Sequence, residues 1–174
     1  ASPARAAGRP VIKEGCALKV RVKFEKYGPA RFMGHLDTMR YFQKAVRRAK
    51  IPVAFSSGFT PHMIMSFAAP LGLGISSSAE YFDMELSEGV SSGGLSSEEL
   101  IRRLDQEMAE GFRVVGARKV PEGRKHNAMA LTAAASYRVT FEEGCGLTAE
   151  DLEGFYAQPK ILVEKESKSG PKTV

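Results

Sequence analysis

Apolar and charged side chains alternate along residues 18–25, in the order LKVRVKFE. This period-two pattern is typical of a β-strand that buries one face and turns the other toward water. The face toward water would be basic, because it holds Lys19, Arg21 and Lys23. The pattern therefore predicts a strand whose solvent side could meet a polyanion.

A helix is predicted over residues 35–50, after a turn signal at 27–29 and before Pro52. Its apolar residues recur at the spacing of an amphipathic helix. The opposite face carries four cations at i, i+4, i+7 and i+8, which are Arg40, Lys44, Arg47 and Arg48. We call these four residues the basic ridge.

The next elements complete a recognisable order. They are short strand pieces at 53–56 and 63–68, a strand at 80–86, a helix at 96–111 and a strand at 112–120. Ser96 followed by Glu99 is the capping-box pattern that marks the start of the second helix. Strand, helix, strand, strand, helix, strand is the order of a ferredoxin-like β-α-β-β-α-β domain, an α+β fold with both helices on one side of an antiparallel sheet.

The last third of the chain predicts a smaller unit. Residues 121–127 are polar and contain glycine, which indicates a linker. Beyond it we expect a partial second β-α-β unit, with strands at 137–141 and 161–163 around a helix capped by Thr148 and Asp151. The expected parts are thus a disordered tail or cloning remnant at 1–17, a ferredoxin-like domain at 18–120, and a partial second unit at 121–174, truncated if the natural chain continues past Val174.

Composition narrows the class of protein. Of the 174 residues, 43% are hydrophobic and 26% charged, which excludes disorder over most of the chain. No stretch is apolar enough for a membrane span, and the amino-terminal residues lack the apolar core of a signal peptide. The two cysteines, Cys16 and Cys145, are isolated, which favours a reducing compartment. We therefore expect a cytoplasmic protein without a membrane partner.

Charge is distributed unevenly along the chain. Residues 19–50 hold ten lysines and arginines against two acidic residues, whereas residues 51–100 hold six acidic residues and no lysine or arginine. Each run can be an ordinary solvated face. The alternative is that the basic half binds nucleic acid. The candidate residues are then Lys19, Arg21, Lys23, Arg40, Lys44, Arg47 and Arg48 for phosphates, with Phe59 and His62 for bases.

Signals for catalysis are sparse. His35 and Asp37 could act as general acid or base at the start of the first helix, but both residue types also pack and stabilise helix starts. An anion-binding loop could be formed by Gly72, Gly74, Ser76, Ser77 and Ser78, although a plain connecting loop has the same composition. The cysteines and histidines show no metal-ligand spacing, so we expect no metal and no cofactor.

Several short motifs lie together within residues 24–86. They are His35-Leu36-Asp37, Arg47-Arg48, the turn from Gly58-Phe59 to His62, Ser66-Phe67, Pro70-Leu71-Gly72 and Glu80-Tyr81. This stretch resembles the signature region of the radical-SAM-linked protein family, a bacterial domain of unknown function. The likeness covers residues 18–120 and continues more loosely to Lys172. Gly34 and Thr60 depart from the family pattern, which often has Ser and Asn there, so no hydroxyl cap carries over to the first helix. The resemblance implies a radical-SAM partner and an RNA context, without a reaction of its own.

Three hypotheses follow. The first is an RNA-binding accessory domain that works with a radical-SAM enzyme in tRNA or rRNA modification or processing. The chain cannot be that enzyme itself, because the iron–sulfur cluster needs closely spaced cysteines. The second is a protein–protein adaptor that docks the radical-SAM partner through the acidic half. The third is a metal-independent ribonuclease or RNA-modifying enzyme that uses His35. We favour the first, in which the domain is not an enzyme.

Overall fold

A computed structural model describes residues 18–87, 94–121, 123–167 and 170–173. The expected tail at 1–17 lies outside these residues. The chain divides into two compact units, Ala1–Ala135 and Ser136–Val174. Each unit is described by itself below.

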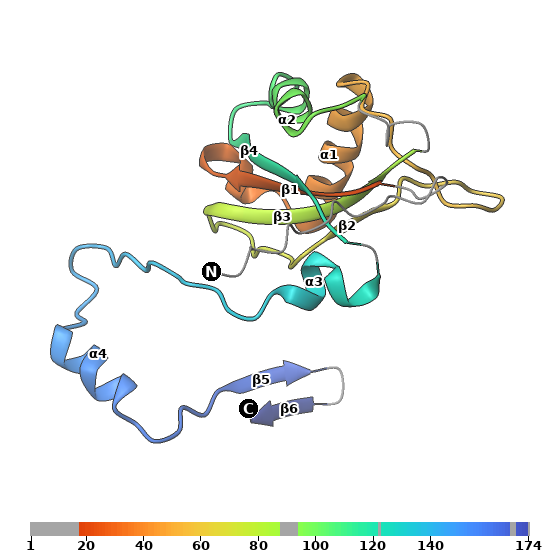
Figure 1. The fold of residues 1–174 in the computed structure, drawn as a ribbon. Coiled ribbons are helices and arrows are strands. Elements are labelled where there is room, and N and C mark those ends of the chain that lie inside the picture. The colour runs from red at the N-terminus through yellow and green to blue at the C-terminus, as the bar shows by residue number, and fades with distance from the viewer. Residues whose placement is uncertain (1–17, 88–93, 122, 168–169, 174) are drawn as a thin grey trace, which may run out of the picture. The chain divides into compact units, whose positions relative to one another are not determined.

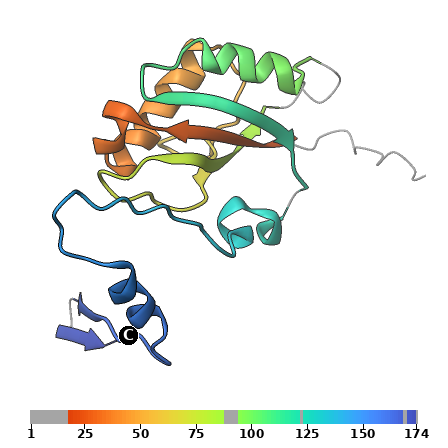
Figure 2. The same cartoon turned by 90° about the vertical axis from the view of Figure 1, so that its left-hand side faces the viewer.

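The first unit is an antiparallel four-stranded sheet with two helices on one face (Figures 1 and 2). Its elements are β1 (Leu18–Lys26), the 3-10 turn η1 (Gly28–Phe32), α1 (His35–Arg48), β2 (Met65–Phe67), β3 (Ser77–Leu86), α2 (Ser97–Asp105), β4 (Phe112–Lys119), η2 (Arg124–His126) and α3 (Ala128–Leu131). The strand order is β2-β3-β1-β4, so β1 lies inside the sheet. The α+β class predicted from the sequence is confirmed.

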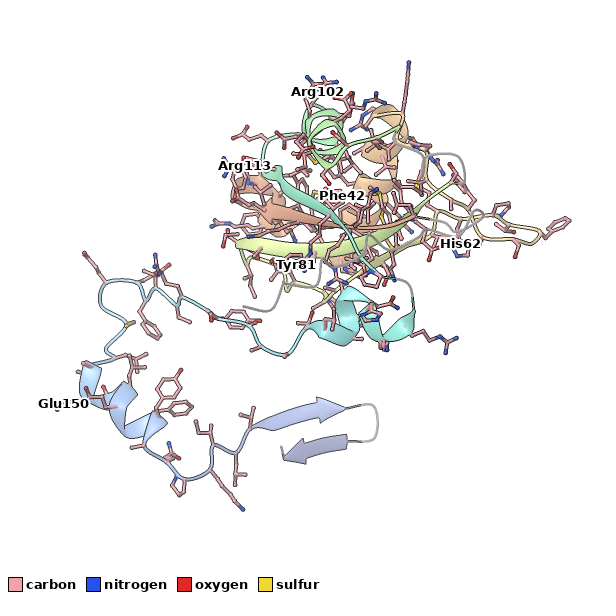
Figure 3. The ribbon with its side chains drawn as sticks, viewed as in Figure 1. Phe42, His62, Tyr81, Arg102, Arg113 and Glu150 are labelled. Carbon is pink, nitrogen blue, oxygen red and sulfur yellow. The ribbon has the colours of Figure 1, made fainter. Side chains whose placement is uncertain are left out.

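The core lies between the sheet and the helices α1 and α2. Val20 and Val22 of β1 are buried, as the alternation predicts, and Leu100 and Leu104 of α2 are buried above the sheet. Phe42 of α1 projects toward the sheet (Figure 3). Five phenylalanine rings pack around one another there, those of Phe24, Phe42, Phe67, Phe82 and Phe112. Because each large apolar side chain contributes roughly 1.5–3 kcal/mol when fully buried, this cluster is a main source of stability.

The helix boundaries follow local signals. Ser96 accepts a hydrogen bond from the Glu99 backbone N–H at 3.1 Å, so the predicted cap of α2 is confirmed. The helix ends at Asp105, earlier than the predicted end at Gly111. Gly111 serves a different contact. A Cβ atom added to it would lie 2.6 Å from the Cβ of Ala30, so only glycine lets η1 pack against the start of β4.

The segment after β4 carries more structure than the linker expected at 121–127. Its helices η2 and α3 lie against the face of the sheet opposite α1 and α2 (Figures 1 and 2). The Arg21 guanidinium donates to the His126 carbonyl at 2.6 Å, and the Ala128 backbone N–H donates to the Asp83 carboxylate at 2.7 Å. We call residues 124–131 the strap. It covers part of the sheet face that the sequence pattern assigned to water.

The second unit contains the helix α4 (Ala149–Tyr156) and a hairpin of β5 (Glu164–Ser167) and β6 (Gly170–Thr173). The Thr148–Asp151 capping box at the start of α4 is present, as predicted. The strands expected at 137–141 and 161–163 are wrong, because both segments lack regular secondary structure. A strand needs a hydrogen-bonded neighbour, and the structure pairs neither segment with one in its described part. Within the described ranges, none of the helices has the length and apolar character required to cross a lipid bilayer.

Candidate nucleic-acid interface

The basic ridge occupies the solvent side of α1. This helix buries Thr38, Phe42, Ala45 and Val46 against the sheet. The amphipathic spacing therefore turns the opposite face outward, and all four cations of the ridge are exposed. Residues three and four positions apart on a helix have Cβ atoms roughly 5–6 Å apart, so the ridge is a continuous line of positive charge.

Two members of the ridge have carboxylate partners. Arg48 Nε lies 2.8 Å from Glu107 Oε2, and its Nη2 donates to the Glu107 carbonyl at 2.9 Å, which ties α1 to the turn after α2. Arg40 Nη1 lies 3.8 Å from Asp37 Oδ1, and the two side chains are 69% and 66% exposed. Such an exposed pair is worth only about 0–1 kcal/mol, so a phosphate can displace Asp37.

Lys44 and Arg47 have no recorded ion pair among the residues that the structure describes. They lie three positions apart on α1 and both side chains are exposed. Their charges are therefore directly available to a ligand from solvent. The capacity of the ridge for phosphate is concentrated at these two residues and at Arg40.

The cations of β1 are placed differently from the ridge. Arg21 is only 6% exposed and forms a two-point ion pair with Asp83, with nitrogen–oxygen distances of 2.7 and 3.0 Å. The hydrogen bond to Asp83 raises the pKa of Arg21, while burial opposes this shift. Lys19 donates to the Asn127 side chain and lies 3.8 Å from Asp83. Lys23 is partly exposed.

Cross-strand register explains why the basic face of β1 is not open. Arg21 lies opposite Asp83 of β3, and the strap then closes over the pair. The alternation within one strand shows which face a residue occupies, but it does not show which residue a neighbouring strand places opposite. The Arg21 guanidinium is therefore not accessible to phosphate in this structure.

Phe59 and His62 lie on a loop that projects from the sheet edge (Figures 1 and 3). Phe55 and Met63 form an isolated β-bridge at the base of this loop. We call residues 55–63 the finger. Phe59 is fully exposed, while His62 is held by Ser56, whose Oγ lies 2.8 Å from His62 Nδ1. The structure thus presents Phe59 to solvent and gives His62 a role in shaping the loop.

The catalytic candidates are not brought together. The His35 ring packs edge-on against Phe67, with ring centroids 5.6 Å apart. Asp37 is exposed and contacts Arg40. No hydrogen bond joins His35 to Asp37 in the described part of the chain. In the same part, no group of three His, Cys, Asp or Glu side chains is gathered as metal ligands would be.

The candidate anion-binding residues lie in the connection from β2 to β3, except that Ser77 and Ser78 are the first residues of β3. This segment borders a shallow depression of about 280 Å³, lined by Glu25, Tyr27, Ser76, Ser77 and Ser78. The Gly74 backbone N–H donates to the Arg31 carbonyl at 2.9 Å, so this amide is already used. Glu25 contributes negative charge to the lining, and a second carboxylate, Glu80, lies on β3 three residues after Ser77. These carboxylates make the loop unfavourable for an anion.

Sequence reasoning did not single out Lys26 as a buried cation. This lysine is 2% exposed at the end of β1, and its Nζ donates to the Met33 carbonyl at 2.7 Å. Burial lowers the pKa of Lys26 and raises the pKa of Glu80, while the attraction between the two charges opposes both shifts. The alternation that places Phe24 inward also places Lys26 inward, so the signal was present in the sequence.

Comparison with known proteins gives one result. No curated protein matches the chain. A family model with the description "Uncharacterized protein conserved in bacteria (DUF2344)" matches residues 19–174. This match spans both units and includes the basic ridge, the finger and the strap. The chain therefore belongs to this conserved bacterial family.

Proposed function

We propose that the domain binds RNA through the basic ridge and acts as an accessory of a radical-SAM enzyme in tRNA or rRNA modification or processing. The observation that carries the RNA part is the exposure of Lys44 and Arg47 on one face of α1, without a recorded ion pair in the described ranges. Contacts to phosphate dominate affinity for nucleic acids. The radical-SAM partner rests on the sequence resemblance alone.

Comparison with the neighbouring helix α2 supports α1 as the helix that binds phosphate. Arg102 and Arg103 of α2 both bind Glu99, at 2.7 and 2.6 Å. This one carboxylate offsets half of their combined charge, whereas no recorded ion pair offsets that of Lys44 and Arg47 within the described ranges. A polyanion that approaches the helical face would therefore be attracted to α1.

We also infer that the unit from β1 to β4 is ferredoxin-like. The support is the element order β1-α1-β2-β3-α2-β4, the antiparallel strand order β2-β3-β1-β4, and the placement of α1 and α2 on one face. In this arrangement the sheet holds α1 from beneath, so the ridge is presented on a rigid element.

The other two hypotheses have less support from the geometry. An adaptor surface would need several exposed acidic residues, but among the described residues of the acidic half only Glu98 is exposed. Asp83 is buried with Arg21, and Glu99 is engaged by Arg102 and Arg103. A ribonuclease would need an acid–base pair, and His35 has a packing contact with Phe67 instead.

Salt dependence tests the ridge. Binding of a fluorescently labelled bulk tRNA preparation is measured by anisotropy over a series of NaCl concentrations. Affinity falls as salt rises, so a plot of log affinity against log salt has a negative slope. In the Lys44→Gln/Arg47→Gln variant we expect this slope to be less steep by roughly 1.4–1.8, because each lost phosphate contact removes about 0.7–0.9.

The matched control is Arg102→Gln/Arg103→Gln, which removes the same charge from α2. Because both arginines are held by Glu99, this variant should reduce the steepness of the salt dependence less than Lys44→Gln/Arg47→Gln does. Equal slopes for the wild type and the Lys44→Gln/Arg47→Gln variant would contradict the proposal.

A further inference from the structure

We infer that the finger recognises an unpaired RNA base by stacking it on Phe59, so that the RNA held by the basic ridge is single-stranded or looped at this point. The inference rests on the proposed function and adds the class of RNA and the residue that reads it.

Hydrogen bonds fix the conformation of the finger. The Ser56 backbone N–H donates to the His62 carbonyl at 2.8 Å, and the Ser56 hydroxyl contacts both the His62 ring and the His62 backbone N–H, at 2.8 and 3.1 Å. At the base, the Ala54 backbone N–H donates to the Glu85 carbonyl of β3 at 2.8 Å. Gly58 has a φ of +117°, a conformation that the turn needs and that a side chain would strain. These bonds hold the tip away from the body of the unit.

Phe59 is placed where it gains nothing from the fold. Five other phenylalanines form the buried core cluster, whereas Phe59 is fully exposed at the turn of the finger. A large apolar side chain in water forgoes roughly 1.5–3 kcal/mol of burial energy, so its position is not explained by stability. A stiff ring with both faces open has the geometry of a stacking platform.

The absence of charged side chains in the finger indicates which part of an RNA it can contact. Residues 51–79 contain no lysine, arginine, aspartate or glutamate, so the finger offers no charged contact to phosphate. Its turn carries Ser57, Phe59 and Thr60, which supply two hydroxyls beside an aromatic ring. Stacking with neutral hydrogen bonding is how proteins read unpaired bases. A membrane-inserting tip would need flanking basic residues, which this segment lacks.

The ridge and the finger are close enough to act on one RNA. The last ridge residue, Arg48, ends α1, and Val53 already forms a bridge with Leu86 of β3. A fully extended chain spans at most about 3.3–3.6 Å per residue, so the Cα atoms of Arg48 and Phe59 lie within roughly 40 Å of each other, a distance that one RNA strand can bridge. The ridge would hold the backbone while the finger meets a base of the same strand. A base within a duplex is already stacked and would not be available to Phe59.

The test uses the full chain and a single-stranded oligoribonucleotide that contains 2-aminopurine, with a blunt-ended, fully paired RNA duplex of the same strand length as comparison. Stacking on Phe59 should change the fluorescence of 2-aminopurine in the wild type. Phe59→Ala should abolish this change and weaken binding of the single strand about 5-fold to about 150-fold, the effect of losing one base–aromatic stack. Its salt slope should equal that of the wild type, because the phosphate contacts remain.

Two further variants make the result specific. Phe59→Trp should keep the fluorescence change, since it keeps an aromatic platform. Leu73→Ala removes another exposed apolar side chain, from a different loop, and should change neither readout. Binding of the paired duplex should be the same for the wild type and Phe59→Ala.

The outcomes separate this inference from the proposed function. If Phe59→Ala binds the single strand like the wild type while Lys44→Gln/Arg47→Gln shows the reduced salt slope, the finger inference is overturned and the ridge stands. If Phe59→Ala leaves RNA binding unchanged but loses a protein partner, the finger is a protein-docking element and the inference is likewise overturned. If the wild type binds neither RNA, both fail.

Discussion

Arg21 and Asp83 carry opposite charges at a place where neither side chain reaches water. Asp83 is 2% exposed and accepts hydrogen bonds from Arg21 and from the backbone of Ala128 in the strap. Arg21 in turn donates to the carbonyl of His126. The pair therefore links two strands and the strap through four charge-assisted hydrogen bonds. Its role in the fold is to hold the strap on the sheet.

Removal of one partner should be costly. We expect Asp83→Ala to lower the free energy of unfolding by about 3–5 kcal/mol, because it leaves the Arg21 charge buried without a partner. Chemical denaturation of both proteins measures this difference. Asp37→Ala, which breaks the exposed contact with Arg40, is the control and should change stability by about 0–1 kcal/mol. A loss below about 1 kcal/mol for Asp83→Ala would show that this pair does not stabilise the fold.

At the scale of one element, α2 is stabilised from its first turn. Glu99 contributes its backbone N–H to the Ser96 cap and its carboxylate to Arg102 and Arg103. The hydrogen bond to Arg102, followed by that to Arg103, lowers the pKa of Glu99 to about 2. An acid with a depressed pKa in the folded state stabilises the fold while it is ionised.

The pH dependence of this effect follows from its sign. Because the pKa of Glu99 falls from its ordinary value of 4.5 to about 2 on folding, its contribution is complete above pH 4.5 and is lost as the pH falls toward 2. The difference in unfolding free energy between the wild type and Glu99→Gln should therefore shrink over this range. Denaturation at several pH values measures it, with Glu110→Gln as a control at another exposed glutamate. A difference that stays constant over this pH range would contradict the assignment.

Elements with local signals could be predicted from the sequence, and elements that depend on distant partners could not. The alternation in β1, the apolar stripe of α1 and the Ser96 cap are all contained within one segment, and each has the predicted structure. Residues 137–141 alternate just as well, but a strand needs a neighbour that alternation does not supply.

The same distinction applies to the candidate site. The exposure of the ridge follows from the helical period, whereas the burial of Arg21 depends on Asp83, which lies 62 residues away in the sequence. The first half of the strap that completes this burial, residues 124–127, is polar and belongs to the segment predicted as a linker. Its ordering depends on hydrogen bonds to the sheet, which no pattern within the segment reveals.

At the scale of the whole molecule, the two units differ in how much they bury. The first contains a continuous core that joins β1, β3, β4, α1 and α2. The helix α4 of the second contains no buried residue. Isolated helices of this length are marginal in water, because helix initiation is unfavourable and little packing offsets it. The units should therefore differ in resistance to local unfolding.

Limited proteolysis with trypsin measures this difference. Arg138 lies in an exposed segment without regular secondary structure, whereas Arg47 and Arg102 lie in helices packed on the core. We expect cleavage at Arg138 well before cleavage at Arg47 or Arg102, because a protease needs an unfolded stretch of chain at its site.

The same digestion tests how the strap is held. In Asp83→Ala, which loses the bond to Ala128, cleavage at Arg124 in the strap should accelerate, while Asp37→Ala keeps the wild-type pattern. Simultaneous cleavage of the helices and of the segment around Arg138 would contradict the difference in stability between the units, and an unchanged rate at Arg124 would show that Asp83 does not hold the strap.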